Sequence, residues 1–127
     1  MKNPTHLLYV DDDDDIRAII ELAFDGDPRF KLTLCQSGQE ALVTAQQDAP
    51  DAILLDVMMP GMDGPTTFQK LRKLPNLGDI PVLFLTAKIQ PPELKALFDL
   101  GATDVITKPF DALSLPDHIF SQLASSQ

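Results

Sequence analysis

Short apolar runs alternate with helix-like segments five times along this chain, and this alternation constrains the fold more than any other feature. The runs lie at about residues 6–10, 30–34, 52–56, 81–86 and 104–107. Strands that alternate with helices favour right-handed crossovers and a parallel sheet. The central runs are apolar on both faces, which suits a sheet that is covered by helices on each side. The sequence therefore predicts a doubly wound α/β domain.

The segments between the runs carry helix start and stop signals. Ser37 and Glu40 form a capping-box pattern, Pro65 suits a first helical turn, and Gly101 suits a helix C-cap. The last helix is predicted to begin near Ser114, so that Pro116 falls in its first turn. The residues that we expect to face the core from the five helices are Ile16, Ile19, Ile20 and Ala23; Ala41, Leu42 and Ala45; Phe68, Leu71 and Leu74; Leu94, Leu97 and Phe98; and Leu115, Ile119 and Leu123.

Size and composition narrow the function classes. The 127 residues, 44% of them hydrophobic, fit one folded domain over residues 1–127. A net charge of −9 opposes binding to nucleic acid. No apolar run is long enough to span a membrane, no signal peptide precedes the first strand, and the lone Cys35 excludes an internal disulfide. We therefore expect a cytoplasmic protein without membrane binding, and we expect no output domain after Leu123.

Polar side chains follow four of the apolar runs, at the point where each run ends. Asp11 and Asp12 follow the first run, Asp56 ends the third, Thr86 ends the fourth and Lys108 follows the fifth. Open parallel sheets bind ligands outside the carboxyl ends of their strands, where the strand order reverses. If the strands lie side by side, three carboxylates, a hydroxyl and an ammonium meet at one site.

Four segments together resemble the receiver domain of two-component response regulators, the CheY-like family. They are Tyr9–Asp12, Leu54–Gly64, Leu85–Ala87 and Lys108–Phe110, in the order and at the spacings of the family. The resemblance covers essentially the whole chain. It implies a (βα)5 flavodoxin-like fold whose five-stranded parallel sheet has the order 2-1-3-4-5.

The resemblance assigns roles to the residues at the strand ends. It implies that Asp56 is the phosphoacceptor and that a Mg²⁺ (or Mn²⁺) ion lies beside it. Asp12 and Asp56 would bind the ion directly, Asp11 would act largely through water, and Met58 would contribute its backbone carbonyl. A divalent cation suits oxygen ligands and would offset the repulsion between an incoming phosphoryl group and a carboxylate.

The resemblance also assigns the remaining polar residues of the site. Thr86 would hydrogen-bond a phosphoryl oxygen and move toward it on activation, and Lys108 would pair with the phosphoryl group. The peptide bond between Lys108 and Pro109 is usually cis in the family. We interpret Asp13, Asp14 and Asp15 instead as a solvated, capped helix start. His6 and His118 are expected to have packing or surface roles.

Val105 departs from the family pattern, and Met58 occupies a position expected to affect the rate of dephosphorylation. The family often has an aromatic residue three positions before the lysine, and Val105 stands there in this chain. A ring switch at that position is therefore absent, which leaves open how the site signals to the surface of helix 4, strand 5 and helix 5. Met58 lies two residues after Asp56, where we expect it to screen an acyl phosphate from water and to slow dephosphorylation.

The resemblance implies a response regulator that takes a phosphoryl group from a sensor histidine kinase or a histidine phosphotransfer protein. The chain itself would catalyse the transfer to Asp56 and the later hydrolysis of the aspartyl phosphate. It would control a downstream target protein through the helix 4, strand 5 and helix 5 face. A phosphorelay intermediate, a phosphate sink and a degenerate receiver that only binds partners remain alternatives. An aspartate-dependent phosphatase is disfavoured, because such enzymes carry a second aspartate where this chain has Met58.

Overall fold

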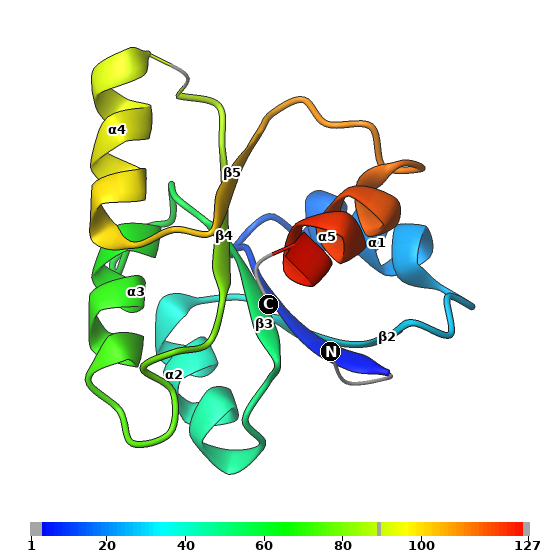
Figure 1. The fold of residues 1–127 in the computed structure, drawn as a ribbon, viewed down its shortest axis with the longest axis horizontal. Coiled ribbons are helices and arrows are strands. Elements are labelled where there is room, and N and C mark those ends of the chain that lie inside the picture. The colour runs from blue at the N-terminus through cyan, green and yellow to red at the C-terminus, as the bar shows by residue number, and fades with distance from the viewer. Residues whose placement is uncertain (1–3, 89, 126–127) are drawn as a thin grey trace.

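The computed structural model describes residues 4–88 and 90–125 and contains five strands that alternate with five helices (Figure 1). In chain order the elements are β1 (Thr5–Val10), α1 (Asp14–Phe24), β2 (Phe30–Cys35), α2 (Gly38–Gln47), β3 (Ala52–Asp56), α3 (Gly64–Arg72), β4 (Val82–Thr86), α4 (Pro91–Leu100), β5 (Asp104–Thr107) and α5 (Leu115–Ser125). All five predicted strands and all five predicted helices are present.

The strands form one parallel sheet in the order β2-β1-β3-β4-β5, as the sequence predicted. Every residue of the three central strands is buried, which explains why the middle of each strand is a run of apolar residues. The register places Val10 beside Leu55 and Thr86 beside Thr107. The strands therefore end at a common edge, where the polar residues follow.

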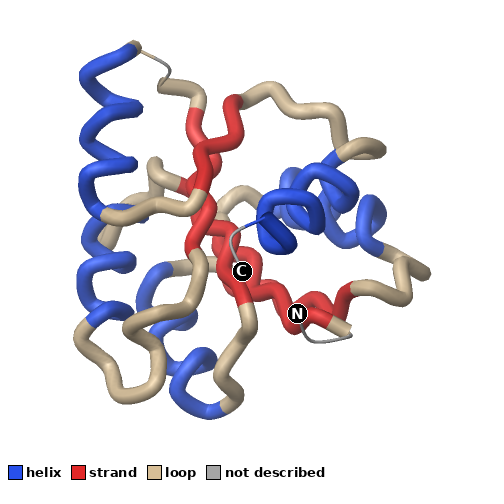
Figure 2. Tube along the Cα trace, viewed as in Figure 1, coloured by secondary structure: helices blue, strands red, loops and turns tan. Residues whose placement is uncertain are grey.

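Helices cover both faces of the sheet, which the tube in Figure 2 shows nearly edge-on between its two helical layers. Helices α2, α3 and α4 pack on one face, against side chains such as Leu8, Ile53 and Phe84. Helices α1 and α5 pack on the other face, against the alternate strand residues, such as Leu7 and Leu54. The strand period of two thus divides each strand between two hydrophobic cores.

The helices begin and end at the capping residues that the sequence indicates. The Asp13 carboxylate accepts hydrogen bonds from the backbone N–H groups of Asp15 and Ile16, and the Ser37 hydroxyl accepts one from Glu40. Gly101 ends α4 with φ of 114°, a left-handed conformation that favours glycine. These contacts agree with the predicted capping roles.

Two predictions about helix faces were wrong. Ile19 and Phe98 are 45% and 47% exposed, although both were expected to face the core. In α1 the buried face instead includes Phe24, which rotates the stripe away from Ile19. In α4 Leu97 is buried and Phe98 lies on the outer side. Leu74 packs against the core, but it lies beyond the end of α3 at Arg72.

The ends of the predicted domain, residues 1–3 and 126–127, lie outside the described residues. Among the helices in the described part of the chain, none is long and apolar enough to cross a bilayer.

Candidate functional site

The polar residues that follow the strands meet at one edge of the sheet. Main-chain hydrogen bonds hold this edge together: the Asp11 N–H donates to Cys35, the Val57 N–H to Leu85 and the Lys108 N–H to Thr86. The last of these measures 2.8 Å and continues the pairing of β4 with β5 beyond the strand end. The site is therefore built on the rigid sheet, not on independent loops.

Three carboxylates gather at this edge. Asp11, Asp12 and Asp56 each present a carboxylate oxygen, and these oxygens lie within 4.8 Å of one another. Asp11 and Asp56 are 0% and 2% exposed, whereas Asp12 is exposed. A set of hard oxygen donors with excess negative charge, open to solvent on the side of Asp12, fits Mg²⁺ or Mn²⁺.

Lys108 places a cation beside the two buried carboxylates. Its Nζ donates a hydrogen bond to Asp56 Oδ1 at 3.0 Å and lies 3.9 Å from Asp11 Oδ2. The preceding strand β5 and the main-chain bond to Thr86 fix the start of this side chain. The peptide bond to Pro109 is cis, as the resemblance implies. The group thus holds one ammonium and three carboxylates, which leaves it with net negative charge.

The surroundings of Asp56 disfavour its ionised form. Burial raises the pKa of Asp56 to about 6, the hydrogen bond from Lys108 opposes that rise, and the nearby Asp11 carboxylate adds to it. A neighbouring cation would favour the charged form. The aspartate is therefore held at the strand end at an energetic cost that a bound cation would relieve.

Thr86 lies at the end of β4 with its side chain fully buried. Its hydroxyl oxygen accepts a hydrogen bond from the Lys88 N–H at 2.9 Å. The oxygen is therefore held by its own loop as an acceptor, and the hydroxyl can still act as a hydrogen-bond donor.

Tyr9 is a further member of the site, for which the sequence predicts no role. Its ring is fully buried in the core beneath α1 and α5, and its hydroxyl donates to Asp11 Oδ2 at 2.5 Å. Burial, followed by the hydrogen bond to Asp11, raises the pKa of Tyr9 far above its ordinary value, so the phenol is a donor. The signal in the sequence was a lone tyrosine within an apolar run, two residues before Asp11 and hence on the same side of the strand.

The chain folds back tightly after Asp56, and Gly64 permits this. The Gly64 N–H donates to Val57, and a Cβ at Gly64 would lie 2.4 Å from the Asp56 backbone oxygen. The neighbouring atoms are backbone and cannot move aside without shifting Asp56. The first residue of α3 is therefore fitted against the end of β3.

We expect Gly64→Ala to lower the free energy of unfolding by about 1–3 kcal/mol, because the added methyl group overpacks a backbone contact. Urea denaturation measures this cost. Gly78→Ala is the matched control, since a Cβ there would meet only the Arg72 backbone oxygen at 3.5 Å, an ordinary contact. Equal stabilities of the two variants would contradict the close fit at Gly64.

Other residues singled out in the sequence lie around this edge or away from it. Met58 is 55% exposed in the loop after Asp56. Val105 packs toward the α2, α3 and α4 core and is partly buried. His6 is buried and its ring is hydrogen-bonded to Thr33, whereas His118 is paired with Asp104 on the surface. Both histidines thus have packing or surface contacts.

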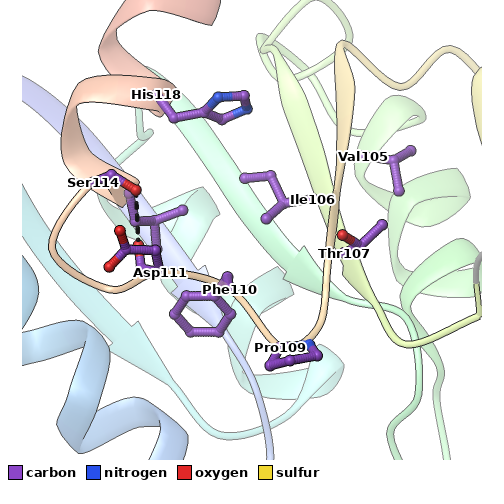
Figure 3. Close-up of a pocket in the computed structure, with 9 residues that line it drawn as sticks. Val105, Ile106, Thr107, Pro109, Phe110, Asp111, Ser114 and His118 are labelled. Atoms are coloured by element: carbon purple, nitrogen blue, oxygen red, sulfur yellow. Dashed lines mark hydrogen bonds between the residues drawn. The ribbon is translucent and has the colours of Figure 1, made fainter.

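A pocket of about 290 Å³ lies beside the site, between β5 and α5 (Figure 3). Ile106, Phe110 and Leu115 give it apolar walls, and His118 and Ser114 lie at its polar side. Figure 3 shows Ile106 and Val105 on opposite sides of β5, so the pocket is on the α5 side of that strand. Its strand leads directly to Lys108.

The comparisons with known proteins agree with this geometry. The family model for the response regulator receiver domain matches residues 7–120. The transcriptional regulatory protein CseB of Streptomyces coelicolor is 37% identical over 115 residues, which cover 91% of this chain and 47% of CseB. Response regulator MprA of Mycolicibacterium vanbaalenii is 41% identical over 109 residues, which cover 84% of this chain and 45% of MprA.

Solved structures match over nearly their whole length. A putative response regulator from Chloroflexus aurantiacus superposes with a TM-score of 0.85 at 36% identity, over 95% of this chain and 98% of that one. The chemotaxis protein CheY4 of Vibrio cholerae gives a TM-score of 0.84 at 29% identity, over 92% and 97% of the two chains. The chain spans about half the length of the curated relatives that it matches. It belongs to the response regulator receiver domain family of two-component signalling systems.

Proposed function

We propose that Asp56 accepts a phosphoryl group from a phosphohistidine on a sensor histidine kinase or a histidine phosphotransfer protein. The observation that carries the proposal is the position of Asp56: a carboxylate at a strand end, 3.0 Å from Lys108 and grouped with Asp11 and Asp12. An Asp56 oxygen attacks phosphorus, the bond from phosphorus to the histidine nitrogen breaks, and the histidine keeps the electron pair.

The residues around Asp56 are suited to this transfer. Asp11, Asp12 and Asp56 would hold Mg²⁺ or Mn²⁺, together with the backbone carbonyl of Met58. The bound cation would supply positive charge that reduces repulsion between the phosphoryl group and the carboxylates. Lys108 would pair with a phosphoryl oxygen while its ammonium stays near Asp56.

Thr86 would connect the site to the rest of the domain. Once phosphoryl oxygens stand beside Asp56, the Thr86 hydroxyl can donate its proton to one of them, and the bond that its oxygen accepts from the Lys88 N–H need not break. Phosphorylation would thereby draw Thr86 and Lys108 inward and shift a pre-existing equilibrium between two conformations. The two residues lie on β4 and immediately after β5, so the shift would act on the β4–α4 loop and on β5.

We propose that a downstream target protein binds the face made by α4, β5 and α5. The pocket beside β5 and the exposed Phe98 of α4 support this choice, because each offers apolar surface to a partner. Transfer of the phosphoryl group onward, as in a phosphorelay or a phosphate sink, is the alternative use of the same site.

The test is incubation with acetyl phosphate and Mg²⁺, followed by the mass of the intact protein. We expect the wild type to gain the mass of one phosphoryl group, and Asp56→Asn or omission of Mg²⁺ to prevent the gain. An adduct that persists in Asp56→Asn would contradict the proposal. It would also be contradicted if the folded wild type gained no mass.

Met58 is expected to set the lifetime of the phosphorylated state. Its side chain follows Asp56 by two residues and is 55% exposed, so it can shield an acyl phosphate from water on the solvent side. We expect Met58→Asn to lose the phosphoryl group several times faster, because an amide can hydrogen-bond an attacking water where a thioether does not. The rate is measured by mass after removal of acetyl phosphate. An unchanged decay rate would refute this role, and Val43→Asn, at a similarly exposed position on α2, is the control.

A further inference from the structure

We infer that Tyr9 is a positioning residue that holds the Asp11 carboxylate away from Lys108 and so keeps Asp11 available for the cation. The inference rests on the proposed function, because it concerns the cation that Asp11, Asp12 and Asp56 would bind. It extends that function to a buried residue of the sheet.

Hydrogen bonds hold the Asp11 carboxylate in place. Both of its oxygens have partners: Oδ1 accepts from the Asp13 N–H at 3.0 Å, and Oδ2 accepts from the Tyr9 hydroxyl at 2.5 Å. The Arg17 guanidinium meanwhile donates to the Asp11 backbone carbonyl at 2.7 Å. The carboxylate is fully buried, so each of these bonds replaces water that cannot reach it.

Lys108 lies closer to the carboxylate of Asp56 than to that of Asp11. Lys108 Nζ lies 3.0 Å from Asp56 Oδ1 but 3.9 Å from Asp11 Oδ2. The Asp11 oxygen nearer to Lys108 is the same oxygen that Tyr9 occupies. A hydrogen bond from a neutral phenol satisfies this oxygen without neutralising its charge.

The consequence of removing the hydroxyl follows from these distances. In Tyr9→Phe, Asp11 Oδ2 would be left buried with only a distant ammonium, and an unsatisfied buried carboxylate attracts the nearest donor. Lys108 would move toward Asp11 and form a closer pair. A divalent cation would then have to displace that ammonium, so its binding would weaken.

The position of Tyr9 supports a role beyond filling space. The ring packs in the core beneath α1 and α5, and phenylalanine would fill nearly the same volume. The hydroxyl is the part that phenylalanine lacks, and it reaches the carboxylate edge. Tyr9 is also the one tyrosine in the sequence, which contains no tryptophan, so its spectrum reports this one contact.

The test compares Mg²⁺ binding by calorimetry in the wild type, Tyr9→Phe and Thr33→Val. We expect Tyr9→Phe to bind about tenfold more weakly, as a charge-assisted hydrogen bond is lost. Thr33→Val is the control. It removes a β2 hydroxyl that contacts His6, and this variant should bind Mg²⁺ with the affinity of the wild type. An equal or tighter affinity in Tyr9→Phe would overturn the inference.

A second readout uses the spectrum of the wild type and does not depend on how Tyr9→Phe folds. Mg²⁺ should shift the near-ultraviolet absorption of Tyr9 in the wild type, because the hydrogen-bond acceptor of its hydroxyl gains a neighbouring cation. Asp11→Asn should lose that shift. A Tyr9 spectrum that does not respond to Mg²⁺ in a wild type that binds the ion would overturn the role of Tyr9.

Different results would contradict the role of Tyr9 and the phosphorylation of Asp56. Phosphorylation of the wild type together with unchanged affinity in Tyr9→Phe would remove the inference and leave the proposed function standing. A wild type that neither binds Mg²⁺ nor gains a phosphoryl group would remove both.

Discussion

Replacing Lys108 by alanine is expected to lower the free energy of unfolding by about 2–3 kcal/mol at pH 7. The ammonium donates a hydrogen bond to Asp56 and lies 3.9 Å from the Asp11 carboxylate, and both carboxylates are buried. Removing one partner of a buried ion pair leaves an uncompensated charge. The Lys108 side chain is 22% exposed, so some water can reach the remaining carboxylates. The expected loss is therefore smaller than the about 3–5 kcal/mol that breaking a fully buried ion pair costs.

The pH dependence of this loss has a defined sign. Lys108 lowers the pKa of Asp56, which burial has already raised to about 6, so without the lysine the pKa rises further. The native state then binds the proton more strongly than the unfolded state, and stability falls as pH rises. The unfolded-state pKa is the same in both proteins, so the difference from the wild type should become small below about pH 6, where Asp56 is protonated in both native states.

Urea denaturation of Lys108→Ala from pH 4 to pH 8 tests this expectation, with Lys95→Ala as the matched control. Lys95 also pairs with a carboxylate, that of Asp99, but both side chains are mostly exposed. A surface pair of this kind contributes about 0–1 kcal/mol. Equal losses in the two variants, or a loss at Lys108 that does not depend on pH, would contradict the electrostatic account of the site.

Replacing Asp56 by asparagine is expected to stabilise the cation-free protein by about 1–2 kcal/mol at pH 7. The shift from an ordinary value of 3.8 to about 6 means that ionised Asp56 opposes folding, at 1.36 kcal/mol for each pKa unit. Asparagine has nearly the same shape without the charge. The gain is smaller than the full shift implies, because the amide accepts a weaker hydrogen bond from Lys108.

This gain should depend on pH and on the cation. The folded-state pKa of Asp56 is raised, so the native state holds its proton more tightly and wild-type stability falls as pH rises from about 4 to about 6. The advantage of Asp56→Asn should therefore appear over this window and stay constant above it. Mg²⁺ should reduce the advantage by stabilising the wild type, because a ligand stabilises the state that binds it.

Thermal or urea unfolding at several pH values measures the gain. Glu21→Gln neutralises an exposed carboxylate on α1 and should change stability by less than about 0.5 kcal/mol. Lower stability of Asp56→Asn at pH 7 would show that the charged form is favoured in the folded protein, against the burial described here.

The sequence predicted the fold well because its signals are long and agree with one another. Runs such as residues 52–56 and 82–86 are buried on both faces, which makes each of them apolar up to the polar residue that ends it. Turn residues separate the runs, and Gly101 needs a positive φ. Prediction failed at Ile19 and Phe98 because spacing alone allows more than one helical stripe, and packing on the sheet selects between them.

The site was predictable only in part, for a geometric reason. Strand ends place Asp56, Asp11 and Lys108 at one edge, since parallel strands share a direction. Which oxygen faces which donor depends on side-chain rotamers, so the spacing of residues in the sequence does not predict the hydrogen bond from Tyr9 to Asp11. The contact between Gly64 and Asp56 likewise depends on the path of the loop after β3.

The most direct test of the central claim locates the phosphoryl group chemically. After incubation with acetyl phosphate and Mg²⁺, reduction with borohydride cleaves an aspartyl phosphate and converts that aspartate to homoserine. Digestion and peptide sequencing by mass spectrometry then identify the modified residue. The account predicts homoserine at position 56, and none at that position without the phosphodonor. Homoserine at Asp11 or Asp12 in place of Asp56 would contradict it.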